Sequence, residues 1–288
     1  MKIFTKIKNI VRYFLTKNPR MYFTYRMFKE SKSVFDVPKN TPMGFKFSGN
    51  LSMENGSFET EEYELVKSIL DKTDVFINVG ANIGYYICLA LNMSKYTIAC
   101  EPIESNLRLL YKNIDANKWK NNLEVYPLAL SNNIGIIKIY GSGVSASLIK
   151  GWGGTKEPYK RFVSSSTLDH IIGNRFLDKR CFLLVDIEGA EMKMLEGSRL
   201  FFERYIKPVC FMEISITEHQ PDGFLINPYL GNTFNFFWEK GYEAFTADKE
   251  KKLILPEEIK TICNTGIDTI LKHNFMFVWK ENQSEILH

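Results

Sequence analysis

Hydrophobic and polar positions follow two alternating periods along most of the chain. Apolar runs typical of buried strands cover residues 75–79, 96–101, 123–127, 181–187, 208–214, 242–247 and 273–280. Helix-like segments at 58–70, 84–93, 104–118, 190–204 and 229–240 separate most of these runs. Strands that alternate with helices predict an α/β fold, with a mostly parallel sheet and helices on both of its faces. Residues 134–140 and 161–172 interrupt the alternation and predict an inserted hairpin or extra strands.

The N-terminal residues have a pattern of their own. Apolar residues between Ile3 and Leu15 recur at helical spacing, and Lys and Arg occupy the other side. This basic amphipathic helix either lies on an anionic membrane surface or docks on the protein body or on a second subunit. Residues 36–57 are rich in Pro, Gly, Asn and Ser and predict a loop region with short strands. We therefore divide the chain into an N-terminal arm and loop region, 1–57, and a domain, 58–288, whose first helix has Thr60 as its expected N-cap.

Composition and charge narrow the function classes. The chain has 288 residues, 45% of them apolar, which is typical of a globular protein. The net charge is +4, but residues 1–32 alone contribute +8, so the rest of the chain is acidic by −4. An acidic body argues against nucleic-acid binding.

Cysteine usage and hydropathy suggest a location. The five cysteines are scattered without zinc or disulfide spacing, which fits a reducing compartment. No apolar run reaches 18 residues, and lysines interrupt the N-terminal apolar segment, so neither a membrane span nor a secretory signal is expected. The sequence predicts a cytoplasmic protein, and the membrane reading of the basic helix would place it peripherally on the inner face of the membrane.

A pair of glycines, Gly80 and Gly84, follows the strand at 75–79. Glycine permits a tight turn and the close approach of a ligand, and a strand–turn–helix unit presents free N–H groups at the carboxyl edge of a sheet. The middle glycine of the dinucleotide fingerprint is missing, which disfavours NAD and FAD. Glu101 ends the next strand and can accept both ribose hydroxyls of a nucleoside. Together these features suggest an adenosine ligand without a pyrophosphate, such as S-adenosylmethionine (SAM). Taken separately, the glycine pair is compatible with tight helix–strand packing, and Glu101 is compatible with a solvated acid at a strand end.

Three blocks, "INVGANIGYY", "CEPIESNLRLLYKNI" and "SSTLDHII" followed by "LLVDIEGAEMKMLEG", resemble the FkbM family of SAM-dependent methyltransferases. The resemblance spans roughly Phe58 to Lys280. It implies a class I methyltransferase fold, Rossmann-like, with a seven-stranded, mostly parallel sheet whose final strand is antiparallel, and O-methylation of sugars or polyketide-like products. It also implies a set of SAM-binding residues: Asn78, Gly80, Ala81, Asn82, Gly84, Glu101, Pro102, Asn106, Ala129 and Leu130. The chain departs from the family pattern in having Asn78 where Asp is common and Val185 where Lys is frequent.

The candidate catalytic residues lie at the ends of the fourth and fifth strands. Methyl transfer is an in-line displacement, and a general base assists a hydroxyl acceptor. Asp186 is the first candidate base, Glu188 the second, and His219, in the loop beyond the fifth strand, the third. Asp186 and Glu213 can alternatively bind a divalent cation, a reading that we do not favour. We read Glu191 and Thr167–Asp169 as mainly structural, and the glycine-rich segment 141–161 as an acceptor-side lid in which Trp152 stacks on a sugar or lies in an ordinary loop.

The leading hypothesis is a SAM-dependent O-methyltransferase that acts on a hydroxyl of a sugar, glycan or glycolipid precursor. Because Asn78 and Val185 depart from the pattern, a non-catalytic binding or scaffold protein with the same fold is the alternative. Another nucleotide-dependent enzyme on a Rossmann-like sheet is a third. The oligomeric state is left open.

Overall fold

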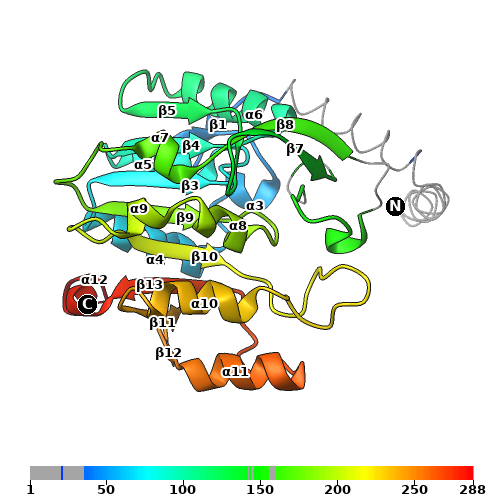
Figure 1. Cartoon of the computed structure of the whole chain (residues 1–288). Helices are drawn as coiled ribbons and strands as arrows, with labels where there is room; N and C mark the ends of the chain where they lie inside the picture. The colour runs from blue at the N-terminus through cyan, green and yellow to red at the C-terminus, as the bar shows by residue number, and fades with distance from the viewer. Residues whose placement is uncertain (1–20, 22–35, 142, 144–145, 156–159, 288) are drawn as a thin grey trace.

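The computed structural model describes residues 21, 36–141, 143, 146–155 and 160–287 (Figure 1). The predicted basic amphipathic helix of residues 1–17 lies outside the described residues. Within the described part of the chain, no helix has both the length and the apolar character that crossing a bilayer requires.

An eight-stranded sheet forms the centre of the domain. Its strands are β3 (Val75–Val79), β4 (Tyr96–Cys100), β5 (Leu123–Tyr126), β9 (Cys181–Val185), β10 (Val209–Glu213), β11 (Tyr242–Thr246), β12 (Leu253–Ile254) and β13 (Asn274–Trp279). Their order is β12-β11-β13-β10-β9-β3-β4-β5. Strands β5, β4, β3, β9 and β10 are mutually parallel, and β13 is antiparallel to both of its neighbours, β10 and β11. The predicted mostly parallel sheet with an antiparallel final strand is therefore confirmed, and the two-residue strand β12 adds an eighth strand that was not expected.

Helices cover both faces of the sheet (Figure 1). The helices are α4 (Thr60–Asp71), α5 (Tyr85–Asn92), α6 (Glu104–Ala116), α7 (Leu168–Ile172), α8 (Glu191–Glu196), α9 (Arg199–Phe202), α10 (Leu230–Trp238), α11 (Pro256–Thr265) and α12 (Gln283–Leu287), with short 3-10 helices at Trp152–Gly154 and Lys280–Asn282. Residues of α4, α5 and α6 pack in one hydrophobic core, and residues of α7 to α11 pack in the other. Within β3, Val75, Ile77 and Val79 belong to the second of these cores and Phe76 to the first, so both faces of the strand are buried.

Two expectations about helices need correction. The N-cap of α4 is Glu59, in a left-handed conformation, and Thr60 is already the first helical residue. The predicted helix at 190–204 is divided into α8 and α9, because the Asp169 carboxylate accepts hydrogen bonds from the backbone N–H groups of Leu200 and Phe201 and so begins a new helix. Asp169 and the N-cap Thr167 are structural, as predicted.

The residues before α4 pack on the domain. They form β1 (Lys39–Asn40), β2 (Lys46–Phe47) and the short helix α3 (Leu51–Glu54), in agreement with the predicted short strands. Phe45, Phe47 and Met53 are buried in the same core as α4 and α5. The predicted boundary at residue 57 therefore does not mark a break in the packing.

The predicted insertion after β5 is a small second sheet. It contains β6 (Ala129–Leu130), β7 (Gly135–Tyr140) and β8 (Lys160–Ser166), in the order β6-β8-β7, and β7 pairs antiparallel with β8. The described residues of the loop between β7 and β8, 141, 143 and 146–155, lie at the carboxyl edge of the main sheet (Figure 1).

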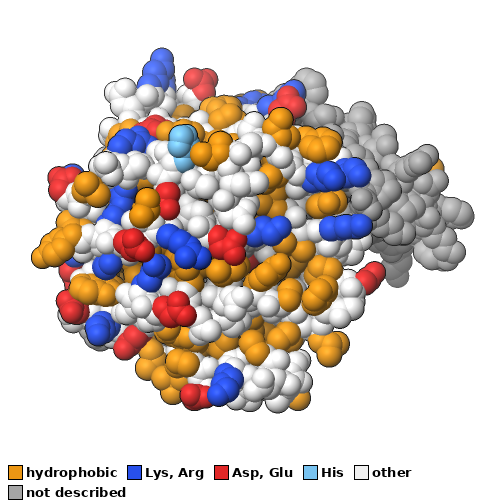
Figure 2. All heavy atoms as spheres, in the orientation of Figure 1, with side chains coloured by type: hydrophobic (Ala, Val, Ile, Leu, Met, Phe, Trp, Pro, Cys, Tyr) orange, Lys and Arg blue, Asp and Glu red, His pale blue; other side chains and the backbone are white. Residues whose placement is uncertain are grey.

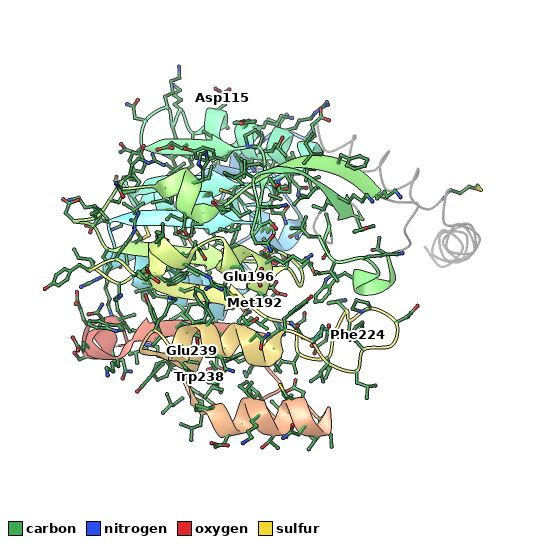
Figure 3. All side chains as sticks on the ribbon, viewed as in Figure 1. Asp115, Met192, Glu196, Phe224, Trp238 and Glu239 are labelled. Carbon is green, nitrogen blue, oxygen red and sulfur yellow. The ribbon has the colours of Figure 1, made fainter. Side chains whose placement is uncertain are left out.

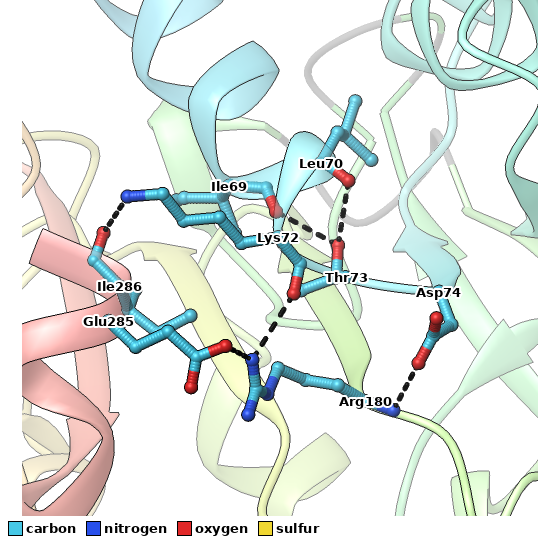
Figure 4. A network of polar contacts seen from close by, with 8 residues as sticks. All are labelled: Ile69, Leu70, Lys72, Thr73, Asp74, Arg180, Glu285 and Ile286. Carbon is cyan, nitrogen blue, oxygen red and sulfur yellow. Dashed lines mark hydrogen bonds and ion pairs between the residues drawn. The ribbon is translucent and has the colours of Figure 1, made fainter. Parts of the chain in front are cut away.

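A polar network ties the C-terminal helix α12 to the amino edge of the sheet (Figure 4). The Arg180 guanidinium contacts the Glu285 carboxylate and the Lys72 carbonyl, while its backbone N–H donates to Asp74. The Lys72 ammonium in turn donates to the carbonyl of Ile286. These contacts fasten the chain end away from the carboxyl edge, where the candidate site lies.

Candidate active site

Two cavities meet at the carboxyl edge of the parallel strands. Together with the open solvent at its mouth, the first contains about 550 Å³ of empty space and the second about 620 Å³. Gly80, Asn82 and Asp186 line both of them. The turn after β3 and the end of β9 therefore form the wall between the two cavities, as expected where parallel strands end together.

The first cavity lies beyond the ends of β4 and β5. Its walls include Glu101, Pro102, Ile103, Asn106, Leu128, Ala129 and Leu130, together with Ile139, Gly143, Ala146 and Leu148. The predicted cofactor residues Pro102, Asn106, Ala129 and Leu130 thus line one cavity together with Glu101. The glycine-rich segment after β7, which the sequence suggested as an acceptor-side lid, lines this first cavity instead.

Glu101 is buried and is held by three hydrogen bonds. One carboxylate oxygen accepts from the backbone N–H of Asn82 at 2.8 Å, and the other accepts from Ile103 N–H at 2.8 Å and from the Asn106 amide at 3.2 Å. Burial raises the pKa of Glu101 to about 7, although these hydrogen bonds oppose the increase. A carboxylate offers about four acceptor positions. Glu101 therefore has room for about one further donor, rather than for both hydroxyls of a ribose.

The structure gives a reason for glycine at position 80 that differs from the one expected from the sequence. Gly80 has φ +83°, and a Cβ on it would lie 1.9 Å from the carbonyl oxygen of Asp186. Protein backbone, rather than a ligand, thus demands glycine at this position. Gly84 has φ +87° and begins α5, but it lines neither cavity.

Asn78 and Ala81 line the second cavity, on the α4–α5 side of the sheet. Asn78 is buried, and its amide nitrogen donates to the carbonyl of Leu184 at 3.4 Å. An Asp side chain at this position would face the same carbonyl without a proton to donate at neutral pH. The unexpected Asn is thus consistent with the local hydrogen bonding.

The second cavity is bounded by the first residues of α4, the first turn of α5 and the ends of β9 and β10. Its acidic lining residues are Glu59, Glu62, Asp186 and Glu213, and its aromatic ones are Phe58, Tyr85, Tyr86 and Phe211. The sequence singled out Asp186 and Glu213 here but not Glu59 or Glu62. The only signal for those two was a run of acids in the first turn of a helix, which has an ordinary explanation in the helix dipole.

Asp186 lines both cavities, and the residue as a whole is exposed. Protein nevertheless surrounds the group, and this desolvation raises its pKa well above the usual value. The negative charges of Glu213 and Glu188 act in the same direction. A carboxylate with a raised pKa between two cavities is suited to accept a proton.

Two further acids of the second cavity have raised pKa values. Burial raises the pKa of Glu213 to about 8, and the charges of Glu188 and Glu59 contribute. Burial also raises the pKa of Glu59 to about 7, against a hydrogen bond of 2.9 Å from the Tyr86 hydroxyl. Several carboxyl groups of this cavity therefore have raised pKa values, because each one that ionises makes the ionisation of the others less favourable.

These raised pKa values predict how stability depends on pH. A carboxyl whose pKa is higher in the folded chain stabilises the fold below its unfolded value near 4.5, and this contribution is lost as the pH rises through the folded value. With pKa values of about 7 for Glu101 and about 8 for Glu191 and Glu213, we expect the melting temperature to fall from about pH 5 to about pH 8. Thermal unfolding of the full chain checks this, and Glu213→Gln should make the decline shallower. A melting temperature that rises steadily over the same range would contradict the expectation.

Glu188 lines the first cavity but is engaged elsewhere. One of its carboxylate oxygens accepts from the Trp152 indole N–H at 2.7 Å. Trp152 is only 3% exposed, and its ring fills the space beside Gly189. The suggestion that Trp152 stacks on a sugar is therefore not supported, because the buried ring serves packing and holds Glu188.

His219 is not brought to either cavity. It lies in the loop between β10 and α10, the loop that also carries Phe224 (Figure 3), and its ring is 6.2 Å from that of Trp152. Glu191 is buried and accepts from the backbone N–H of Gly189 at 2.8 Å, so it holds the turn after β9, as expected for a structural residue. Within the described residues, no group of three or more His, Cys, Asp or Glu is arranged to hold a metal ion.

Comparisons with known proteins identify the class. A family model described as the methyltransferase FkbM domain matches residues 78–244, more than half of the chain. The protein belongs to this family and is a methyltransferase. Among curated proteins, none matches the chain.

Solved structures with a similar arrangement include precorrin-6y C5,15-methyltransferase of Geobacter metallireducens. It is 11% identical, with a TM-score of 0.38 over 81% of this chain and 91% of that one. A putative RNA methyltransferase of Pyrococcus horikoshii is 13% identical, with a TM-score of 0.35 over 87% and 96%. The StiE O-methyltransferase is 6% identical, with a TM-score of 0.39 over 75% and 72%.

The residues of the first cavity fit a SAM-like cofactor. Ile103, Leu130 and Leu148 provide apolar surface suited to a purine ring, and Glu101 retains an acceptor position for a hydroxyl. The buried side-chain oxygen of Asn82, on the wall that both cavities share, has no hydrogen-bond partner among the described residues. A buried acceptor without a partner is costly unless a ligand donates to it.

Proposed function

We propose that this protein is a SAM-dependent O-methyltransferase whose acceptor is a hydroxyl of a sugar, glycan or glycolipid precursor. The single observation that carries the proposal is the position of Asp186, which borders both cavities at the point where they meet. A residue in that position can touch a donor in one cavity and an acceptor in the other. SAM, when bound, supplies an electrophilic methyl group on a sulfonium.

The chain's own residues divide the remaining work. In the first cavity, Glu101 and the apolar residues around it hold the adenosine part of the cofactor. In the second cavity, Asp186 accepts the proton of the acceptor hydroxyl, and the aromatic walls exclude water and orient the acceptor. General-base assistance of this kind contributes about 10²–10⁴-fold to the rate, and alignment of the reacting groups contributes further.

The proposal is tested by methyl transfer from radiolabelled SAM. Purified full-length protein is incubated with extracted cell-envelope glycans and, in parallel, with total protein and RNA fractions. Label that enters the glycan fraction, and depends on protein that has not been heat-denatured, supports the proposal. Label that enters only protein or RNA overturns the acceptor class, and intact protein that binds no SAM overturns the cofactor.

Glu101→Gln should weaken SAM by at least about tenfold, because charge-assisted hydrogen bonds contribute about 1.5–3 kcal/mol. It should also lower the melting temperature, since a side-chain amide N–H₂ must then face one of the three donors that Glu101 now accepts from. Calorimetry with SAM and thermal unfolding measure the two effects. Glu104→Gln is the matched control, because Glu104 is an exposed acid on α6 that contacts Arg108. Equal SAM affinity in the Glu101→Gln and Glu104→Gln proteins would leave Glu101 as a structural residue only.

A further inference from the structure

The second cavity has an unusual charge balance. Four of its lining residues are acids, Glu59, Glu62, Asp186 and Glu213, and among the described residues that line it none is Lys, Arg or His. On the face shown in Figure 2, by contrast, acidic and basic side chains are interspersed. The one-sided charge of this cavity is therefore not shared by the face shown in Figure 2.

Only some of these acids have hydrogen-bond partners within the protein. Glu59 accepts from the Tyr86 hydroxyl and Glu62 from the Asn274 amide. Within the described residues, by contrast, no hydrogen bond or ion pair is found for the carboxylate of Asp186 or of Glu213.

The buried side-chain oxygen of Asn82, on the wall of the same cavity, is a third acceptor without a partner. The unsatisfied groups in the cavity are thus hydrogen-bond acceptors that carry negative charge or partial negative charge. A complementary ligand has to bring donors or a positive charge.

Aromatic rings supply an independent indication. Phe58, Tyr85, Tyr86 and Phe211 line the cavity together with the acids. The ring centroids of Phe58 and Tyr85 are 5.4 Å apart, and those of Tyr85 and Tyr86 are 5.3 Å apart, so these three rings pack edge to face as one aromatic cluster beside the cavity. Aromatic faces attract organic ammonium groups through their quadrupole, and ammonium ligands are commonly recognised by aromatic side chains.

We infer that the second cavity receives an organic ammonium group of the acceptor, so that the substrate is an amino sugar or a related amino alcohol. This inference rests on the proposed function, because it specifies the acceptor of the same site. The ammonium lies between the Glu213 carboxylate and the aromatic residues, and the neighbouring hydroxyl faces Asp186. Phosphorylated and uronic acid acceptors are disfavoured, because they would add negative charge to a cavity whose described lining residues include no cation.

The experiment compares two probes that differ by one atom. Choline carries a quaternary ammonium at every pH, and 3,3-dimethyl-1-butanol has the same shape with carbon in place of nitrogen. Binding of each is measured by calorimetry on the full-length protein saturated with S-adenosylhomocysteine. We expect choline to bind at least about tenfold more tightly than its neutral isostere, as a desolvated cation–π contact of about 2 kcal/mol or more would allow. Equal binding of the two probes, or tighter binding of the isostere, overturns the inference.

Variants locate the effect in the cavity. Glu213→Gln should reduce the preference for choline at least fivefold, whereas Glu218→Gln, at an exposed acid on the following loop, should leave it unchanged. Choline binding should also strengthen from about pH 6 to about pH 8.5, since the probe does not titrate while the pKa values of Glu59 and Glu213 lie at about 7 and about 8. The titratable groups that face Glu213 or line the cavity are Glu59, Glu62, Tyr85, Tyr86, Asp186, Glu188 and Glu191. If Glu213→Gln leaves the preference for choline over its isostere unchanged, the cation binds elsewhere and the assignment is wrong.

Failure of this inference can be told apart from failure of the proposed function. The binding comparison needs no turnover, so it stands even if no glycan fraction is labelled. If choline displaces S-adenosylhomocysteine, the cation occupies the cofactor's own position, and the inference about the acceptor is wrong while SAM binding is upheld. If the glycan fraction is labelled but choline and its isostere bind alike, the proposed function holds and the acceptor bears no ammonium group.

Discussion

Asp186→Asn should reduce methyl-transfer turnover about 10²–10⁴-fold and leave SAM affinity within a few-fold. The substitution keeps the shape of the side chain and removes its ability to accept a proton. Asp186 lies where both cavities meet, and its carboxylate has no hydrogen bond to another described residue, so the loss of the base should disturb little else. Turnover with labelled SAM and calorimetric SAM affinity are measured on the same preparation.

The control is Asp115→Asn, at an exposed position on α6 (Figure 3), which should behave as the unaltered protein. If Asp186→Asn retains most of its turnover, the base has to be sought among the other acids of the site. Glu188 is then the nearer choice, although its bond to Trp152 restrains it, since His219 lines neither cavity. Turnover of the unaltered protein that disappears with a chelator would instead favour a cation held by Asp186 and Glu213.

The same assignment fixes the sign of the pH dependence of turnover. A general base acts in its ionised form, and desolvation together with the charges of Glu213 and Glu188 raises the pKa of Asp186. Turnover should therefore increase as the pH rises through that raised pKa and then level off. In Asp186→Asn this dependence should be absent from the residual turnover.

The sheet could be predicted from sequence because its strands are buried on both faces. Runs such as Val75–Val79 and Cys181–Val185 are fully buried, so they read as continuous apolar segments. The helix α11 and the strand β12 were missed. The strand β12 has only two residues, which is too short to leave an apolar period, whereas α11 buries Ile259 and Ile262 on one face and is as amphipathic as the predicted α6, so its pattern was present and was overlooked.

The first cavity was largely predictable, and the second was not. Gly80, Glu101 and Asp186 follow parallel strands, and the carboxyl ends of such strands necessarily share one edge. Glu59 and Glu62 reach the same edge only because α4 packs on α5 and directs its N-terminus there. Likewise, nothing local to Trp152 shows that its ring fills the space beside Gly189. These placements depend on contacts between distant segments, which hydrophobic periodicity does not report.

Gly80→Ala should both destabilise the fold and abolish tight SAM binding, because the added methyl group meets protein backbone. Gly80 has φ +83°, which costs an L-residue about 1–2 kcal/mol. Its Cβ would lie 1.9 Å from the Asp186 carbonyl oxygen, and relief of such overpacking costs roughly a further 1–3 kcal/mol. The backbone that has to move carries Asp186 and the wall between the cavities, so SAM affinity should fall at least about tenfold. A larger residue such as valine would meet the same backbone, so the fold cannot be assumed to survive it.

The variant Gly223→Ala separates the conformational cost of a positive φ from the steric cost of the contact with backbone. Gly223 has φ +92°, close to that of Gly80, but nothing lies within 4 Å of its added Cβ. It should therefore lose only the conformational part of the stability and bind SAM as the unaltered protein does. Chemical denaturation gives both free energies of unfolding, and calorimetry gives both affinities. If the two variants lose equal stability, the turn after β3 relaxes freely around a side chain. If, in addition, Gly80→Ala binds SAM normally, the contact between Gly80 and Asp186 does not shape the site, and the cofactor is held by Glu101 and the first cavity alone.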